Sequence, residues 1–222
     1  MIYILHLETS TKVCSVALSC DGKQIAIKED LSNEYSHAEN LTIYIQEVLL
    51  QSSISLKELS AVSVASGPGS YTGLRIGVST AKGLCYALEI PLIAVDSLIS
   101  LATIANEKHV GMNLCALIDA RRMEEFNGFY SSDLKSLKAV SADIITEDSY
   151  KEFEPFIYFG DGAIKLEEIW MDRNCTIDKT IYSSAMGQIS LAFEKFNKKQ
   201  FEDVAYFEPF YLKDFMGLKK NN

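Results

Sequence analysis

A glycine turn between an apolar run and an amphipathic segment is the part of the sequence best suited to binding chemistry. The run at residues 61–65 predicts a strand, Gly-Pro-Gly at 67–69 breaks it, and a helix is predicted over residues 73–88. Backbone N–H groups at the positive end of a helix can hold phosphate or another anion. The spacing fits neither the P-loop, which ends in Gly-Lys and a hydroxyl residue, nor the dinucleotide motif, which needs glycine where Thr72 stands. We therefore interpret the turn either as an anion site or as a tight structural turn.

An acidic residue with neighbouring hydroxyls ends the first predicted strand. Glu8 follows the apolar run at residues 2–7 and precedes Thr9 and Ser10. A carboxylate at such a strand end can position a metal ion and water around a transferred phosphate, although glutamate is longer than the aspartate that suits this task. Glu8 is therefore either such a ligand or an acid of a surface loop. The candidate nucleotide- or anion-binding residues of the two turns are Glu8, Thr9, Ser10, Gly67, Gly69, Ser70, Thr72 and Gly73.

Two predicted helices carry apolar seams that can serve a core or an interface. The helix over residues 36–50 has Leu41 and Tyr44 on its seam, and Ser36 with Glu39 predicts a capping box at its start. In the helix after the glycine turn, the seam advances by alternating steps of four and three residues: Leu74, Val78, Ala81, Cys85 and Leu88. A separate ridge of small residues, at Gly73, Gly77 and Ala81, would let another helix approach closely. Packing within one subunit and packing between subunits both remain open.

The sequence offers no constellation for hydrolytic or zinc chemistry. His6, His37 and His109 are widely spaced, and neither His-Glu-x-x-His nor Gly-x-Ser-x-Gly occurs. Ser70 lacks the second glycine of a nucleophile elbow and is interpreted as a turn residue. No catalytic residue, no metal ligand and no required cofactor is therefore predicted.

Composition limits the partners and the compartment. With 222 residues, of which 48% are apolar, the chain can form one large or two small domains. The formal charge of −9 argues against direct nucleic-acid binding by counterion release, and we interpret the short basic patches at residues 198–199 and 219–220 as solubilising. The five cysteines show no metal or disulfide spacing, and no segment has the length and apolarity of a membrane span. A cytoplasmic protein is expected.

The order of predicted elements suggests an internal duplication. The first half has the pattern βββαβαβα, with strands at 2–7, 13–18, 24–27, 61–65 and 91–95. The second half restarts with a strand at 114–118, then Asp119, a polar turn and a return strand through Tyr130, which repeats the arrangement around Glu8. Later segments are predicted as a strand at 156–159, helices at 164–170 and 185–196, and a last strand at 209–212.

Long motifs resemble one known family over nearly the whole chain. They cover residues 4–11, 14–18, 67–77, 81–84, 118–121 and 208–212, and they resemble the bacterial TsaB (YeaZ-type) subunits of the tRNA threonylcarbamoyladenosine-modification complex. Glu8 stands where the family usually has aspartate, and Lys213 where arginine is common. The resemblance implies a two-lobed α/β fold of the actin, hexokinase and heat-shock ATPase (ASKHA) type, built from duplicated βββαβα units. The implied lobes are residues 1–108, with the dimerisation helices, and a reduced lobe at 109–222.

The same resemblance implies a noncatalytic dimerisation or scaffold subunit. It would be required for threonylcarbamoyl transfer to the adenosine next to the tRNA anticodon, and it would activate a related catalytic TsaD-type subunit. That relative carries a His-x-x-x-His metal pair where this chain has Ser97 and Leu101. A small TsaE-type ATPase would join the complex, tRNA would bind only indirectly, and an adenine nucleotide could bind within the complex. The implied interface residues are those of the two seams: Leu41, Tyr44, Leu74, Val78, Ala81, Cys85 and Leu88.

Two alternatives belong to other functional classes. One is an active ATP-dependent sugar-kinase-like enzyme or ATPase of the same fold, which would need to bind nucleotide by itself. The other is a stand-alone homodimer with a regulatory binding role.

Overall fold

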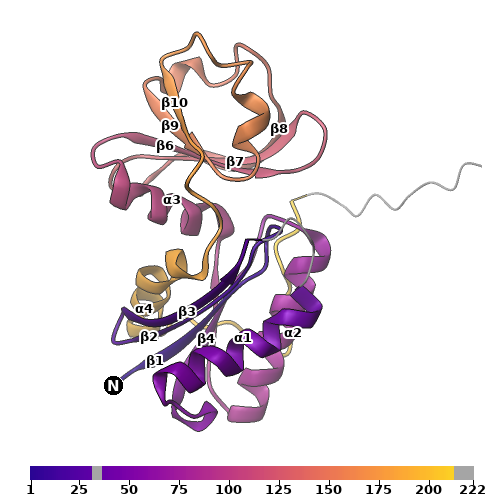
Figure 1. The fold of residues 1–222 in the computed structure, drawn as a ribbon, viewed down its shortest axis with the longest axis vertical. Helices are drawn as coiled ribbons and strands as arrows, with labels where there is room; N and C mark the ends of the chain where they lie inside the picture. The colour runs from indigo at the N-terminus through magenta and orange to yellow at the C-terminus, as the bar shows by residue number, and fades with distance from the viewer. Residues whose placement is uncertain (32–36, 213–222) are drawn as a thin grey trace, which may run out of the picture.

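Two five-stranded mixed sheets, one from each half of the chain, form the framework of the protein (Figure 1). The computed structural model describes residues 1–31 and 37–212. The first sheet has the strand order β3-β2-β1-β4-β5, and the second, read from its far edge, has the order β8-β7-β6-β9-β10. In each, three antiparallel strands are followed by two strands parallel to the first. The predicted duplication is therefore confirmed at the level of topology.

The first unit follows the predicted element order. Its elements are β1 (Tyr3–Glu8), β2 (Cys14–Cys20), β3 (Lys23–Asp30), α1 (His37–Ser52), β4 (Leu59–Ala65), α2 (Tyr71–Leu88) and β5 (Leu92–Val95). Asp21 and Gly22 both have positive φ, as the tight turn of a twisted hairpin requires. Helices α1 and α2 cover one face of this sheet (Figure 1). The proposed cap residue Ser36 lies outside the described residues.

The second unit has the same arrangement of strands, but within residues 113–178 no α-helix corresponds to α1 or α2. Its strands are β6 (Asn113–Asp119), β7 (Glu124–Tyr130), β8 (Ser136–Ile144), β9 (Phe156–Phe159) and β10 (Cys175–Asp178). Strands β8 and β10 were not predicted, because they carry few large apolar side chains. The prediction of a helix over residues 164–170 is wrong, because this segment contains only part of the short 3₁₀ turn η3 (Ala163–Leu166). Another 3₁₀ turn, η2 (Lys151–Phe153), precedes β9.

An aromatic cluster takes the place of those helices. Trp170 is almost fully buried and lies 5.1 to 6.1 Å, centroid to centroid, from the rings of Tyr150, Phe156 and Tyr158. The Arg173 guanidinium lies over the Trp170 ring at 4.9 Å. Large aromatic rings bury much area per residue, so loops and turns suffice to cover this face of the sheet.

Each unit contributes a helix to the other sheet. Helix α3 (Ser97–Lys108) follows β5 but packs against β6 and β7, whereas α4 (Ile189–Asn197), preceded by the 3₁₀ turn η4 (Ala185–Gln188), follows β10 but packs against the first sheet (Figure 1). The predicted segment at 185–196 is thus confirmed as helical. The assignment of lobes to residues 1–108 and 109–222 stays a prediction.

The C-terminal segment forms a strap along the first lobe. The strand predicted at 209–212 is wrong, since those residues adopt no regular structure. Glu202 instead forms an isolated bridge with Leu92 at the β5 edge, and the Lys82 ammonium donates to the carbonyl oxygens of Ala205 (3.1 Å) and Phe207 (2.9 Å). The Phe210 amide donates to the Ser66 carbonyl at 2.7 Å. These contacts cover an edge strand that would otherwise be open to pairing.

We expect Trp170→Ala to lower the free energy of unfolding by about 3–5 kcal/mol, because it leaves a cavity among the buried rings. Met171→Ala is the matched control: Met171 is 74% exposed, and its replacement should change stability by less than about 0.5 kcal/mol. Urea unfolding followed by circular dichroism measures both. Equal effects of the two substitutions would contradict the structural role of the aromatic cluster.

Candidate functional site

The glycine turn and the turn after β1 pack directly against each other. The Ser70 amide donates to the Ser10 carbonyl at 2.6 Å, and the Thr9 hydroxyl donates to the Gly73 carbonyl at 2.8 Å. A Cβ atom on Gly69 would overlap the Ser10 carbonyl oxygen, and one on Gly73 would overlap that of Thr9. Glycine is therefore needed because backbone approaches backbone here.

The amides of Ser70 and Gly73, at the start of α2, have partners within the protein. Ser70 is the N-cap, and its hydroxyl oxygen accepts from the Gly73 amide at 3.3 Å. Gly67 has φ of 106°, and a Cβ on it would meet the Phe210 carbonyl oxygen at 2.5 Å. Thr72 is exposed. The structure thus brings the predicted anion-site residues other than Thr72 together in a packed junction; anion binding there stays a prediction.

Glu8 lies inside this junction, not on a surface loop. Its side chain is almost fully buried; Oε1 accepts from the Ser10 amide at 2.8 Å, and Oε2 accepts from Gln188 Nε2 at 3.4 Å. Burial raises the pKa of Glu8, while these hydrogen bonds lower it and oppose the shift. The interpretation of Glu8 as a surface acid is therefore wrong.

The equivalent turn of the second unit has its own internal partner. Asp119 Oδ1 accepts from the Arg121 amide at 2.6 Å, as Glu8 accepts from Ser10. The Lys165 ammonium contacts Asp119 (2.8 Å), the buried carboxylate of Glu125 (2.5 Å) and the Arg122 carbonyl oxygen (2.7 Å). Burial raises the pKa of Glu125 to about 8, against the opposing effect of Lys165. One ammonium group thus binds the oxygens that converge on this turn.

Gln188 connects the Glu8 turn to a buried histidine. Its Nε2 donates to the Leu7 carbonyl at 2.9 Å, which leaves its Oε1 to accept from the Ser63 hydroxyl at 2.7 Å. Because the Ser63 proton is used there, Ser63 accepts from His6 Nδ1–H (2.7 Å), and His6 Nε2 accepts from the Ser19 hydroxyl (2.8 Å). The Ser63 contact therefore requires a proton on His6 Nδ1, and burial favours the neutral ring, which is the Nδ1–H tautomer. Burial lowers the pKa of His6 to about 3.

The two predicted interface seams lie in the chain's own core. All but one of their residues are buried, and Leu88 is half-buried: Leu41, Tyr44, Leu74, Val78, Ala81, Cys85 and Leu88. The small ridge faces the turn after β1, since a Cβ on Gly77 would overlap the Thr9 hydroxyl oxygen. These seams form the interior of one subunit because they face the sheet. A large charged residue at Ala81 would therefore disrupt this core directly.

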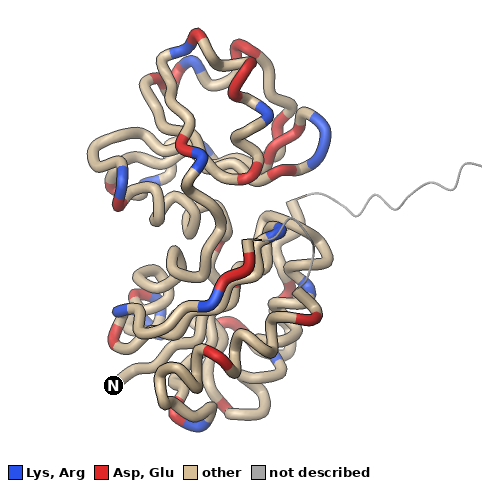
Figure 2. The backbone as a smooth tube through the Cα atoms, in the orientation of Figure 1, with Lys and Arg blue, Asp and Glu red and all other residues tan. Residues whose placement is uncertain are grey.

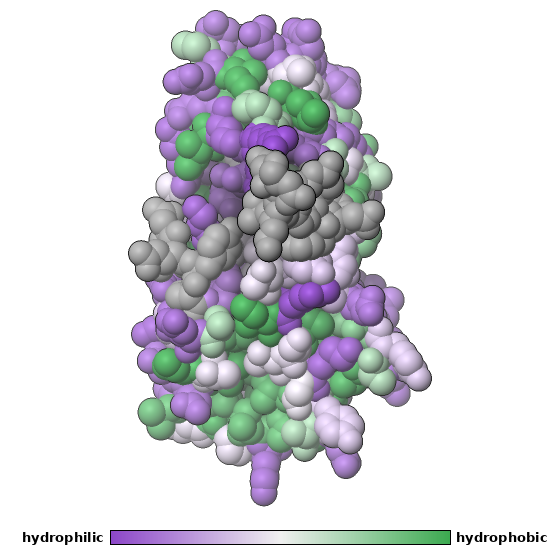
Figure 3. Space-filling model, turned by 90° about the vertical axis from the view of Figure 1, so that its right-hand side faces the viewer, coloured by the Kyte–Doolittle hydropathy of each residue, from purple (hydrophilic) through white to green (hydrophobic). Residues whose placement is uncertain are grey.

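The opposite face of α1 and α2 is exposed and partly apolar. Ile43, Leu50 and Tyr86 are 48%, 82% and 83% exposed, and an added Cβ on Gly83 would meet nothing within 4 Å. In Figure 3 the lower lobe shows a broad apolar to neutral area with hydrophilic residues around it. Sequence periodicity marked these helices but not this face, because exposed small residues leave no periodic signal.

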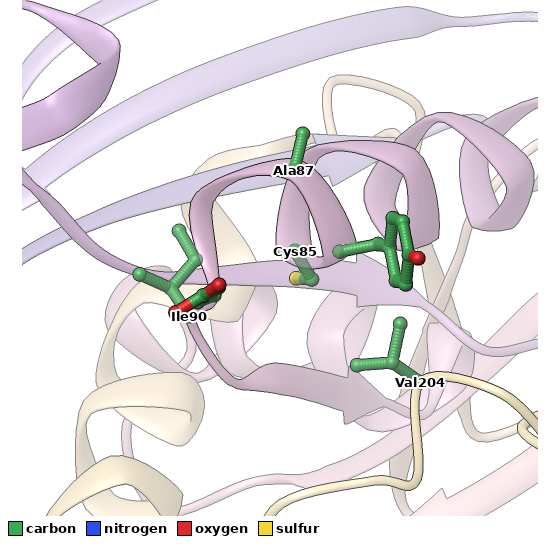
Figure 4. Close-up of a pocket in the computed structure, with 6 residues that line it drawn as sticks. Cys85, Ala87, Ile90 and Val204 are labelled. Atoms are coloured by element: carbon green, nitrogen blue, oxygen red, sulfur yellow. The ribbon is translucent and has the colours of Figure 1, made fainter.

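A shallow groove separates the end of α2 from the strap. It has a volume of about 530 Å³ and is lined by Cys85, Tyr86, Ala87, Glu89, Ile90 and Val204. Figure 4 shows Val204 beside the last turns of α2, on the same side as Cys85. Burial raises the pKa of the Cys85 thiol to about 11, so this thiol stays protonated.

Charge is distributed over both lobes. Acidic and basic residues are interspersed along the described chain (Figure 2).

Among residues 1–31 and 37–212, none of the helices combines the length and apolarity needed to cross a membrane.

We expect His6 to keep its neutral Nδ1–H tautomer from pH 8 down to pH 5. An unfolded histidine gains a proton below about pH 6.5 and the folded one does not, so stability present at neutral pH is lost as the pH falls. The imidazole ¹⁵N shifts report the tautomer directly. Between pH 6 and pH 5, wild type should lose about 1 kcal/mol more unfolding free energy than His6→Gln. A protonated or Nε2–H ring at pH 5 would refute the assigned hydrogen-bond directions.

Comparison with known proteins supports the resemblance. The family described as TsaD, tRNA N6-adenosine threonylcarbamoyltransferase, matches residues 32–214. The chain is 29% identical to the tRNA threonylcarbamoyladenosine biosynthesis protein TsaB of Haemophilus influenzae, over 98% of this chain and 96% of the relative. It is 28% identical to the protein of the same name in Escherichia coli, over 98% and 97% of the two chains.

A solved structure has the same fold. YeaZ from Pseudomonas aeruginosa superposes with a TM-score of 0.83 at 26% identity, over 96% of this chain and 100% of that one. The match spans both sheets, which agrees with the two-lobed actin-like fold expected from the motifs. The chain belongs to the tRNA N6-adenosine threonylcarbamoyltransferase (TsaD) family, and within it to the TsaB/YeaZ type.

Proposed function

We propose that this chain is a noncatalytic scaffold subunit in the synthesis of threonylcarbamoyladenosine on tRNA. It pairs with and activates a related catalytic subunit of the TsaD type, which transfers the threonylcarbamoyl group to the adenosine next to the anticodon. The names of its TsaB relatives support a role in this biosynthesis, and the match to the transferase family supports a structurally related partner.

One observation carries the noncatalytic part of the proposal. The acids of both duplicated turns are engaged by side chains of the same protein, Glu8 by Gln188 and Asp119 by Lys165. A phosphoryl-transfer site of this fold needs such carboxylates free to hold metal ions and water. Here an amide and an ammonium group contact them instead. A scaffold subunit needs no metal ion at these carboxylates, so the internal contacts are compatible with its role.

The exposed face of α1 and α2 is the surface proposed for pairing. Its exposed apolar residues are Ile43 and Leu50 on α1 and Tyr86 on α2, and Tyr86 lies one helical turn from the exposed Gly83. Close helix packing requires such positions, and exposed apolar area supplies the driving force. When isolated, the same face can pair two copies of this chain.

Further partners follow from the same proposal. A small TsaE-type ATPase joins the pair, tRNA binds through the catalytic subunit, and an adenine nucleotide binds only within the assembled complex. The formal charge of −9 agrees with an indirect contact to tRNA, since direct binding relies on clustered cations. A cytoplasmic location is part of the proposal.

We expect threonylcarbamoyladenosine formation by the catalytic subunit and the ATPase to depend on this chain. Reconstitution with and without it, followed by nucleoside mass spectrometry of the tRNA, measures this dependence. Full activity without the chain would overturn the scaffold proposal. Nucleotide hydrolysis by the purified chain alone would favour the kinase-like or ATPase alternative.

We expect Gly83→Lys to weaken pairing with the catalytic subunit at least about tenfold, which corresponds to about 1.4 kcal/mol. The new side chain meets open space in the isolated chain, and replacing glycine inside a helix favours the helix, so the thermal midpoint should not fall. Ser190→Lys, on an exposed position of α4, is the matched control. Calorimetric titration measures both; equal affinities for the two variants would place the interface elsewhere.

A further inference from the structure

The segment from Tyr182 to Gln188, which includes η4, lies between the two lobes. It descends from β10 of the second sheet to α4, which packs on the first (Figure 1). Its polar side chains are buried where the segment meets the first sheet, and its backbone touches α3 on the other side. Both lobes therefore contact the same short segment.

Gln188 anchors one end of the segment to the first sheet. It is fully buried, and its amide group uses both of its polar atoms on the sheet: Nε2 on the Leu7 carbonyl of β1 and Oε1 on Ser63 of β4. The chain of hydrogen bonds runs on from Ser63 to His6, and from His6 to Ser19 of β2. Every group in this chain of hydrogen bonds is inaccessible to water, so breaking any link leaves a buried polar atom without a partner.

Glu29 anchors the other end. Its carboxylate, on β3, accepts from the hydroxyls of Ser184 and of Tyr182, the latter at 3.2 Å, and from Ser15 of β2 at 2.7 Å. Ser15 in turn accepts from the Ala185 amide at 2.9 Å. The segment is thus attached to four neighbouring strands, β3, β2, β1 and β4, by side chains at both of its ends.

The opposite side of the segment touches the helix of the second sheet. A Cβ on Gly187 would overlap the Ser100 carbonyl oxygen of α3, so the η4 and α3 backbones are in direct contact. Helix α3 packs on β6 and β7 through Leu98, Leu101 and Ala105. A change in the angle between the lobes would move α3 relative to η4 and would have to break either this contact or the buried hydrogen bonds.

We propose that residues 182–188 form a polar wedge that fixes the angle between the two lobes. The chain then behaves as one rigid body instead of opening and closing around a ligand. Directional hydrogen bonds hold the wedge in one position on the first sheet, and the close backbone contact between η4 and α3 transmits this position to the second lobe. This inference concerns the chain alone and does not depend on the proposed partner.

Double electron–electron resonance, which measures the distance between two spin labels, tests the wedge. Labels at Gln46→Cys on α1 and Lys135→Cys in the second lobe, with Cys20 and Cys175 replaced by serine, report the separation of the lobes. Wild type should give one narrow distance distribution. In Gln188→Leu, which keeps the volume but loses the amide, the distribution should be about twofold broader or split into two.

Two further variants keep the test decisive. Ser63→Ala removes only the hydroxyl between His6 and Gln188 and should broaden the distribution even where Gln188→Leu fails to fold. Gln51→Leu makes the same chemical change on an exposed position of α1 and should leave it narrow. Distributions for Gln188→Leu or Ser63→Ala as narrow as that of Gln51→Leu would overturn the wedge, as would a broad distribution in wild type.

Discussion

The contact between two stretches of backbone, the first turn of α2 and the turn after β1, is the constraint on which the first lobe depends. Carbonyl oxygens of Thr9 and Ser10 lie where side chains of Gly73 and Gly69 would be. This approach places α2 against the sheet, consumes the Ser70 amide and buries Glu8 beneath the junction. The turn that the sequence predicts as an anion site is thus also a packing junction, in which the Ser70 amide binds the Ser10 carbonyl and the Gly73 amide binds the Ser70 hydroxyl.

The second lobe meets the same demands with different residues. Its turn also has an acid that accepts from the amide two residues on, but Lys165 supplies a charge where the first lobe has the neutral amide of Gln188. Its sheet is covered by rings around Trp170 instead of two helices. Duplicated topology thus fixes where a carboxylate stands, while the residues that contact it come from unrelated segments. The two lobes are joined because α3 packs on the second sheet and α4 packs on the first.

Much of the framework could be predicted from the sequence, because it is encoded locally. Apolar runs and the Asp21-Gly22 turn predicted the strands of the first unit, and apolar seams at helical spacing predicted its helices. The seam was also expected as an interface, and here periodicity was insufficient: it shows which face is apolar, not whether a sheet or another subunit covers it. The contacts of Lys165 with Asp119 and of Gln188 with Glu8 could not be predicted, because they join residues far apart in the sequence and no local pattern indicates them. The apolar run at 209–212 looked like a strand, yet its neighbours hold it as a strap.

The buried polar groups explain why a chain can retain a two-lobed fold without the movement that such folds usually serve. In a lobed enzyme the cleft must stay hydrated or filled by ligand, so its polar groups change partners as it closes. Here Gln188, His6 and Glu29 have partners within the protein. Opening the lobes would have to break either the contact of η4 with α3 or these hydrogen bonds, of which those of Gln188 and His6 are shielded from water. In the proposed wedge, rigidity is a consequence of these internal contacts, and it agrees with the scaffold role proposed for the chain.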